Sequence, residues 1–305
     1  MSIPLAYIIV VLIWSTTPLA IKWSGEGAGF LFGVTARMII GVTLVLTLIR
    51  IMGLTLPWHR RARKIYLISG LGIYTAMLSV YWAAQFIPSG WISVLFGLTP
   101  ITTGIMARLW LNERGLTRPR LFSLMIALAG LIVIFLQGAE LGVNTLYGVG
   151  GVLVSVLSHS LSSVWIKRDG LQMHGLLVTG GGLLVSVPLF LLTWFFSGEV
   201  IPDQVSARAL SSIIYLGVVG TGIGFALYYF ILRHVEATKV AMLTMITPVM
   251  ALLIGLLLNG EQIKPQVWLG TGLIMLGLTG FQLGERIVSK LKNSGPRSVN
   301  REPAV

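Results

Sequence analysis

Long apolar runs separated by short polar linkers make up most of this 305-residue chain. Each run is about 20 residues long, which at roughly 1.5 Å of rise per helical residue matches the ~30 Å hydrocarbon core of a bilayer. The strands of a membrane barrel would be shorter and would alternate apolar with polar positions. The pattern therefore predicts an all-α polytopic membrane protein with ten transmembrane helices, at about residues 4–22, 30–49, 65–86, 89–111, 119–137, 147–166, 176–197, 209–232, 236–258 and 265–284.

The fourth and ninth runs repeat one pattern. Residues 89–113 read SGWISVLFGLTPITTGIMARLWLNE, and residues 237–261 read ATKVAMLTMITPVMALLIGLLLNGE. A Thr-Pro step interrupts each run, at Pro100 and at Pro248, and a glutamate follows 13 residues after each proline. The offset of 148 positions between the prolines indicates that the chain contains two copies of one unit.

Other residues extend the duplication beyond these two runs. Tyr81 and Tyr229 are also 148 positions apart. We interpret the chain as two five-helix repeats, residues 4–137 and 147–284. Because five is an odd number, the second repeat enters the membrane from the opposite side, so the two repeats lie inverted. Inverted repeats place a binding site near the midplane at their interface, which suits alternating access.

The charged residues give this arrangement a direction. The chain has 22 Lys and Arg and 10 Asp and Glu, which gives a net charge of +12. With both termini in the cytoplasm, 18 basic residues lie on the inner side, three lie on the outer side and Arg37 lies within the membrane. This bias follows the positive-inside rule. We expect the basic residues, including those of a disordered cytoplasmic tail at residues 285–305, to contact anionic lipid headgroups rather than nucleic acid.

Composition excludes several classes of function. The chain has no cysteine, and none of its Asp or Glu residues is central to a predicted helix. Of its four histidines only His159 lies deep in a predicted helix. An intramembrane enzyme needs a nucleophile with a base, paired carboxylates or clustered metal ligands, so we expect no catalysis, metal or cofactor. The glycine clusters lie in apolar helices without a βαβ pattern, so nucleotide binding is not expected either.

Three features follow one another in order along the chain. The first helix contains Leu-Ile-Trp-Ser at residues 12–15, each fourth helix has the central proline and terminal glutamate, and each fifth helix carries a glycine, Gly130 and Gly277. This ordered set, over about residues 5–283, resembles the drug/metabolite transporter superfamily in its ten-helix form with two EamA domains. The resemblance implies a permease of the bacterial inner membrane, commonly an exporter of amino acids or other small metabolites. It also implies a cavity lined by the first, third and fourth helices of each half.

Deep polar and aromatic side chains are the candidates for contact with a small-molecule substrate. Ser155, His159 and Ser162 follow i, i+4, i+7 spacing and form one polar stripe on the sixth helix. Trp14 lies 145 positions before His159, so the two are counterparts with dissimilar chemistry. The predicted substrate-binding residues are Trp14, Tyr81, Thr99, Ser155, His159, Ser162, Tyr229 and Thr247.

His159 has two interpretations. A neutral imidazole can hydrogen-bond a substrate or titrate near neutral pH. Alternatively, the neighbouring serines satisfy its nitrogens and its role is structural. If export is coupled to protons, His159 is the one obvious titrating group; otherwise the protein is a facilitator driven by the substrate gradient, or an exchanger.

Arg37 also has two interpretations. It lies about 11 Å inside the outer end of the second helix, where an arginine costs roughly 3 kcal/mol on insertion scales. Its guanidinium is either a counter-charge for a substrate carboxylate or a snorkelling side chain tied to carbonyls or headgroups.

Pro100 and Pro248 are candidate hinges. Each proline removes one backbone hydrogen bond and frees a carbonyl that needs a partner in hydrocarbon. The alternative is an inert kink in which the hydroxyls of Thr99 and Thr247 satisfy those carbonyls.

The leading functional hypothesis is a secondary transporter that exports amino acids or related solutes. Exporters of aromatic amino acids in the superfamily tend to carry an aromatic residue before the fourth-helix proline, and Thr99 and Thr247 do not fit that pattern. A facilitative channel or a multidrug-type efflux protein is the alternative, although the small multidrug pumps use an intramembrane glutamate. The substrate and the oligomeric state stay open, and a homodimer is one arrangement.

Overall fold

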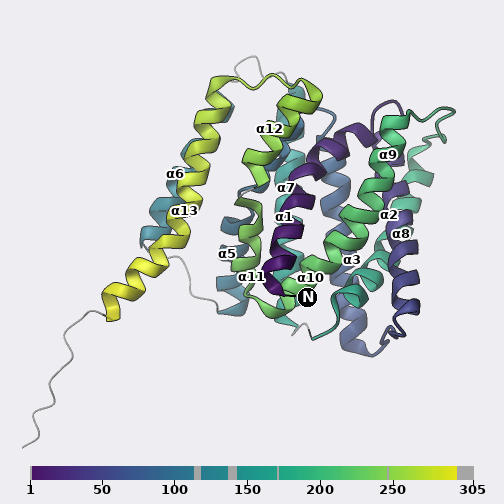
Figure 1. Cartoon of the computed structure of the whole chain (residues 1–305), viewed down its shortest axis with the longest axis horizontal. Coiled ribbons are helices and arrows are strands. Elements are labelled where there is room, and N and C mark those ends of the chain that lie inside the picture. The colour runs from purple at the N-terminus through teal and green to yellow at the C-terminus, as the bar shows by residue number, and fades with distance from the viewer. Residues whose placement is uncertain (1, 113–117, 137–142, 170–171, 246, 294–305) are drawn as a thin grey trace, which may run out of the picture.

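The computed structural model describes residues 2–112, 118–136, 143–169, 172–245 and 247–293, and within them every regular element is a helix (Figure 1). Seven described helices are long and apolar enough to cross a membrane, which confirms the prediction of a polytopic helical membrane protein. They are Ile3–Ser24, Phe30–Ile51, Arg60–Ala83, Ser89–Leu111, Val143–Arg168, Gly175–Ser197 and Ala207–His234.

The first half of the chain forms five hydrophobic segments, the fourth of which is broken. The predicted run at residues 89–111 divides into two helices before and after Gly97 and Leu98. The elements are α1 (Ile3–Ser24), α2 (Phe30–Ile51), α3 (Arg60–Ala83), α4 (Ser89–Phe96), α5 (Thr99–Leu111) and α6 (Arg118–Leu136).

The second half is more interrupted than its pattern predicts. The run expected at residues 209–232 contains a π-helical stretch, and the run at 236–258 contains a 3-10 turn. The elements are α7 (Val143–Arg168), α8 (Gly175–Ser197), α9 (Ala207–Tyr215), the π-helix η1 (Leu216–Ile223), α10 (Gly224–His234), α11 (Ala237–Ala241), the 3-10 helix η2 (Met242–Met245), α12 (Thr247–Asn259) and α13 (Pro265–Asn293).

The last helix is longer than expected. It was predicted to end at residue 284, with a disordered tail from residue 285, whereas α13 continues as a helix to Asn293. Residues 294–305 of the predicted tail lie outside the described residues.

Both broken fourth segments use the same local chemistry. Pro100 lies in the first turn of α5, where the amide that proline lacks is not needed within the helix. The carbonyl that each proline leaves without its helical donor is bonded by the preceding threonine. Thr99 Oγ1 donates to the Phe96 carbonyl at 2.6 Å, and Thr247 Oγ1 donates to the Thr244 carbonyl at 3.2 Å.

Helices of the two halves pack mainly against each other. In the first half, α1 packs against α9, α10 and α12. In the second half, the equivalent helix α7 packs against α3 and α5. Side-chain hydrogen bonds reinforce the contacts of α1, because the Tyr7 hydroxyl donates to the Lys239 carbonyl at 2.8 Å and the Thr16 hydroxyl lies 2.6 Å from that of Tyr215.

The pair α6 and α13 stands at one side of the bundle (Figure 1). Glycines bring their backbones together. A Cβ at Gly130 would lie 2.5 Å from the Gly270 carbonyl oxygen, and a Cβ at Gly277 would lie 2.5 Å from the Ser123 carbonyl oxygen. Only glycine fits at both places, which is the close packing that small residues allow between membrane helices.

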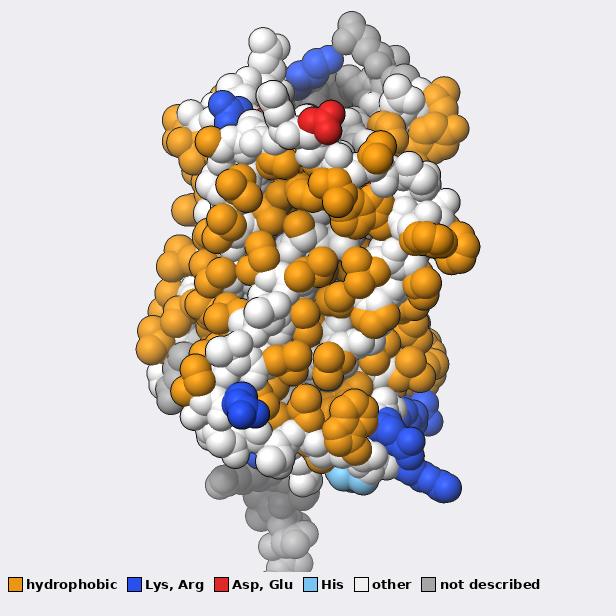
Figure 2. Space-filling model, turned by 90° about the vertical axis from the view of Figure 1, so that its right-hand side faces the viewer, with side chains coloured by type: hydrophobic (Ala, Val, Ile, Leu, Met, Phe, Trp, Pro, Cys, Tyr) orange, Lys and Arg blue, Asp and Glu red, His pale blue; other side chains and the backbone are white. Residues whose placement is uncertain are grey.

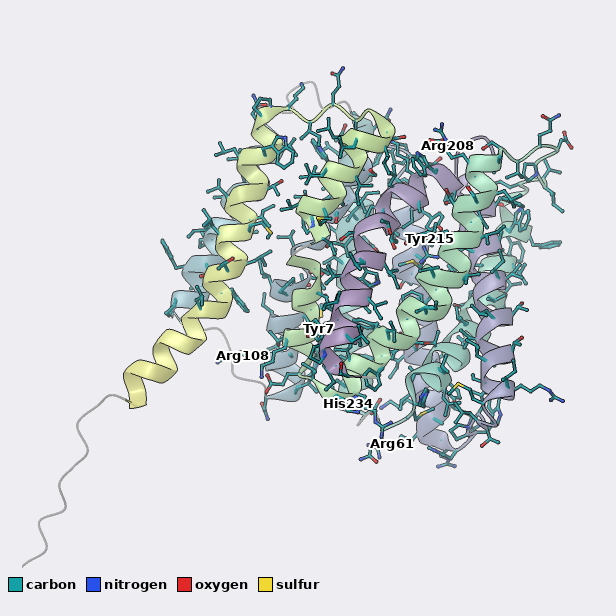
Figure 3. All side chains as sticks on the ribbon, viewed as in Figure 1. Tyr7, Arg61, Arg108, Arg208, Tyr215 and His234 are labelled. Carbon is teal, nitrogen blue, oxygen red and sulfur yellow. The ribbon has the colours of Figure 1, made fainter. Side chains whose placement is uncertain are left out.

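The surface matches a protein surrounded by lipid. Figure 2 shows apolar side chains over the middle of one face and basic side chains near its two ends. Arg61, Arg108 and His234 lie at the end of the bundle where the chain begins, and Arg208 lies at the opposite end (Figure 3). Large apolar residues on the periphery are exposed, as in Phe195 with 80% of its surface accessible, which a water-facing surface would disfavour.

Candidate functional site

A cavity of about 70 Å³ lies between the two halves of the chain. It has space for several water molecules, and it is smaller than the ~300–1,000 Å³ typical of small-molecule pockets. The first half contributes α1, α2, α3 and α4, and the second half contributes α7, η1, α10, η2 and α12. The lining residues are Trp14, Thr17, Pro18, Ile21, Arg37, Met77, Val80, Ile92, Ser93, Phe96, His159, Gly220, Phe225, Thr244 and Thr247.

An aromatic cluster forms one part of the wall. The rings of Trp14 and His159 meet edge to face with centroids 5.7 Å apart. Tyr228 contacts both rings, at 5.3 Å from Trp14 and 5.0 Å from His159. The two counterparts identified from the sequence, Trp14 and His159, are therefore neighbours in the cavity wall.

The imidazole of His159 makes no hydrogen bond to another described residue. Ser163 donates its hydroxyl to the His159 backbone carbonyl at 2.7 Å, so it does not bond the ring. Ser155 and Ser162, the other members of the predicted stripe, bond to α3 instead. The structure therefore does not show the alternative in which neighbouring serines hydrogen-bond the imidazole nitrogens of His159.

The hydroxyls of Ser155 and Ser162 join α7 to α3. Ser155 Oγ donates to the Ala76 carbonyl at 2.7 Å, and Ser162 Oγ donates to the Ile68 carbonyl at 3.1 Å. Neither serine lines the cavity. Their predicted contact with substrate stays a prediction, and the bonds observed here are structural.

Arg37 is the one Lys or Arg residue on the wall of this cavity, and only 2% of it is exposed. Its Nε donates to Thr221 Oγ1 at 2.8 Å, and its Nη1 donates to the Tyr81 hydroxyl at 3.4 Å. Its guanidinium carbon lies 5.9 Å from the centroid of the Tyr81 ring. Among the described residues no carboxylate forms an ion pair with it. The side chain does not snorkel, because its partners are interior side chains of α3 and η1.

The π-helix η1 makes room for this guanidinium. A Cβ at Gly220 would lie 3.1 Å from Arg37 Nη2, and a Cβ at Gly217 would lie 3.1 Å from the Arg37 carbonyl oxygen. On α2, a Cβ at Gly41 would lie 2.5 Å from the Thr221 methyl carbon. Glycines on both helices therefore bring Thr221 within hydrogen-bonding distance of Arg37.

The remaining predicted residues divide between the wall and the layer behind it. Thr247 lines the cavity, whereas Tyr81, Thr99 and Tyr229 do not. Tyr81 accepts from Arg37, Thr99 bonds within its own helix break, and the Tyr229 hydroxyl lies 2.8 Å from Ser69 Oγ. The proposed hinge residues Pro100 and Pro248 follow wall residues closely, since Phe96, Thr244 and Thr247 all line the cavity.

Several wall residues are not among the substrate-binding residues predicted from the sequence. Thr17, Pro18, Ser93 and Thr244 all line the cavity. The signal for two of them was present, because Thr17-Pro18 is a further Thr-Pro step inside an apolar run, like those of the fourth and ninth runs. Thr221 carried no such signal, since its role depends on the π-helical turn.

A polar cluster around Glu261 joins the two halves of the chain. The buried carboxylate of Glu261 accepts from the Ser89 amide at 3.1 Å, the Ser89 hydroxyl at 2.8 Å and the Gly90 amide at 3.4 Å. Asn259 Nδ2 donates to it at 3.1 Å, and Lys22 Nζ lies 4.0 Å away. The carboxylate thus caps the N-terminus of α4, a favourable place for a negative charge. The motif glutamate of the first half, Glu113, lies outside the described residues.

A model of the EamA-like transporter family matches the chain twice, over residues 1–136 and 146–281. The uncharacterised transporter YoaV of Bacillus subtilis is 29% identical over 283 residues, which cover 91% of this chain and 95% of YoaV. The uncharacterised inner membrane transporter YedA of Escherichia coli is 25% identical, covering 90% of this chain and 88% of YedA. A protein of Streptantibioticus cattleyicolor named as a probable terminal-alkyne amino-acid exporter is 23% identical, covering 92% of both chains.

The fold is also found in a crystal structure of another protein. Its chain is 20% identical, superimposes with a TM-score of 0.69, and the match covers 94% of this chain and 99% of the other. At this identity the likeness concerns the fold alone.

Proposed function

The chain belongs to the EamA-like transporter family, and on that premise we propose that it exports amino acids or related small metabolites across the bacterial inner membrane. The proposed mechanism is alternating access by two inverted five-helix repeats, with ten spans and both termini in the cytoplasm. The observation that carries the proposal is the cavity, because both halves of the chain contribute to its wall. A rocking motion of one half against the other would open such a cavity to either side in turn.

The packing between the halves supports the inverted arrangement. The contacts of α1 with α9, α10 and α12 correspond to those of α7 with α3 and α5 once the halves are exchanged. The contact between Trp14 and His159 also supports it, since two equivalent residues would touch where a pseudo-two-fold axis passed between them.

The broken helices supply the proposed hinges. At Pro100 and Pro248 one carbonyl is held by a threonine hydroxyl instead of a backbone amide. Bending there costs one side-chain hydrogen bond, worth roughly 0.5–1.5 kcal/mol, rather than the rupture of a continuous helical ladder. Because Phe96, Thr244 and Thr247 lie both at the breaks and on the wall, bending would change the shape of the cavity.

The choice of amino acids as substrates draws on a relative named as an amino-acid exporter and on the chemistry of the cavity wall. Its wall joins aromatic rings to a few hydroxyls and one cation, which suits a small solute with both apolar and polar parts. A facilitative channel and a multidrug-type efflux protein remain the competing functions.

Counterflow in proteoliposomes tests the proposal. Vesicles preloaded with unlabelled amino acids should accumulate the labelled forms saturably, and empty vesicles should not. Conductance that rises linearly with solute would indicate a channel. Exchange restricted to large organic cations would indicate multidrug-type efflux.

A further inference from the structure

We infer that the cavity contains a carboxylate-binding subsite in which the Arg37 guanidinium holds the carboxylate of an amino acid or similar small organic acid. The inference rests on the proposed transport function, and it adds the substrate class and the residues that position the cation. Its starting point is a charge imbalance. Arg37 is 2% exposed, lines the cavity, and has only neutral hydrogen-bond partners among the described residues.

A buried cation with only neutral partners is costly. Burial removes the water that stabilises the charge, and two hydroxyl groups replace only part of it. The five donor hydrogens of a guanidinium exceed the two hydrogen bonds found here. A carboxylate in the cavity would supply a negative charge beside Arg37, so this surrounding favours an anionic ligand over a neutral or cationic one.

Among the described residues, no group accepts a hydrogen bond from Nη2 of Arg37. Thr221 occupies the Nε hydrogen, and Tyr81 accepts from Nη1 at the long distance of 3.4 Å. Nη2 lies beside Gly220, which is itself a wall residue. The edge formed by Nη1 and Nη2 is therefore the part available for a bidentate carboxylate, the arrangement that a planar guanidinium binds best.

The π-helix η1 fixes the orientation of the Arg37 guanidinium. π-helical turns inside longer helices occur frequently at functional sites. Here η1 places Thr221 as an acceptor for Arg37 and puts a glycine, Gly220, where a side chain would cover Nη2. Thr221 and Gly220 are thus positioning residues for the cation.

The wall favours a carboxylate over a phosphate. A single guanidinium balances one negative charge, whereas a phosphate monoester carries between one and two at neutral pH. Apolar wall residues surround the cation, with Phe96 and Phe225 available to the remainder of the ligand. An organic cation would be repelled by Arg37, which argues against the multidrug alternative.

The test compares acids with amides that lack only the carboxylate. Purified protein is titrated with L-leucine, L-threonine and L-phenylalanine, and with their three amides, at constant chloride. Binding is read from the rise in melting temperature. We expect at least one acid to bind about tenfold or more tightly than its amide, the gain expected of a charge-assisted bidentate contact. Arg37→Gln should remove that preference, and Arg37→Lys should restore part of it.

Two further variants keep the test decisive. Arg50→Gln removes the same charge from the exposed last turn of α2 and should leave the preference unchanged. If Arg37→Gln fails to fold, Thr221→Val carries the test, because it keeps the charge and removes the Nε acceptor. It should weaken acid binding about fivefold, as for the loss of one hydrogen bond, and leave amide binding unchanged.

The outcomes separate the subsite from the transport function. Equal binding of acids and amides, no binding of any acid, a preserved preference in Arg37→Gln, or tighter binding of phenyl phosphate would each overturn the subsite. Counterflow of other metabolites would still support a transporter in those cases. Conversely, Arg37-dependent acid binding without any counterflow would establish the subsite and refute transport.

Discussion

The third segment of each half shows how one fold carries two different chemistries. In the first half, α3 is an unbroken helix from Arg60 to Ala83. In the second half, the equivalent segment is divided into α9, η1 and α10. Each packs against the second helix of the other half, α3 against α8 and η1 against α2.

The residues at these two equivalent interfaces differ in polarity. Arg37 of α2 meets Thr221 of η1. At the 148-residue offset of the repeats, Thr221 corresponds to Ile73, and a Cβ on Gly182 of α8 would lie 3.3 Å from the Ile73 side chain. Gly182 lies 145 positions after Arg37, the offset that relates Trp14 to His159, so a glycine and an isoleucine occupy here the places of the arginine and the threonine. Both halves supply the cavity wall, and the divergence of their side chains places a single arginine, Arg37, on it.

The largest effect on stability and transport is expected when the residue of one interface is placed in the other. Thr221→Ile imports the isoleucine found at the equivalent place on α3 and leaves Arg37 Nε without its acceptor in a buried site. This should cost about 1–3 kcal/mol of stability and abolish most transport. The mirror variant Ile73→Thr should have a smaller effect, because the new hydroxyl can bond to a carbonyl of its own helix. Equal loss of melting temperature in both variants would show that the two interfaces are energetically alike.

An intermediate effect is expected at the point where the repeats meet. His159→Ala removes ring contacts with Trp14 and Tyr228, which are worth about 0.5–1.5 kcal/mol. Substrate affinity should fall roughly twofold to tenfold while the protein stays folded in detergent. His234→Ala, at an exposed histidine, is the matched control. If initial rates of counterflow depend on pH equally in wild type and His159→Ala, this histidine is not the coupling group.

The smallest effect on affinity is expected at the two helix breaks. Pro100→Ala and Pro248→Ala each allow a backbone amide to bond the carbonyl now held by threonine, which stiffens the segment. Exchange should slow about threefold to tenfold, from a barrier raised by roughly one hydrogen bond, and binding should change less than twofold. Stopped-flow binding and counterflow on the same samples measure both quantities. A loss of affinity with unchanged exchange would contradict the hinge role, and a difference between the variants would show which half bends.

The sequence predicted the site only in part. Arg37, His159 and Trp14 stood out because a cation, an imidazole and an indole are rare deep in apolar helices, and all three line the cavity. Ser155 and Ser162 were grouped with His159 by helical spacing, yet their hydroxyls bond to α3. Helical spacing shows which residues lie on the same face of a helix. In the folded protein part of that face contacts a neighbouring helix, as Ser155 and Ser162 do, and another part lines the cavity, as His159 does.

Hydrophobic length and repetition determined the larger features from the sequence alone. Runs of about 20 apolar residues indicate membrane-spanning helices, since inside a bilayer a helix satisfies its own backbone hydrogen bonds. The 148-residue offset showed the duplication because it preserves prolines, glutamates and tyrosines in order. Hydrophobic length is a local property of the sequence, and the repeat is found by comparing one part of the chain with another. Neither depends on how the helices pack.

Tertiary structure decided which polar groups meet. Membrane helices are apolar on nearly every side, so their sequences do not reveal how each is rotated about its axis. Close approach at Gly41, Gly217 and Gly220, together with the π-helical turn, brought Thr221 to Arg37. A π-turn shifts the register of all later residues on its helix, and the contacts that stabilise it come from another helix about 180 positions away. The charge of the cavity was visible in the sequence, whereas its orientation came from packing between the two halves.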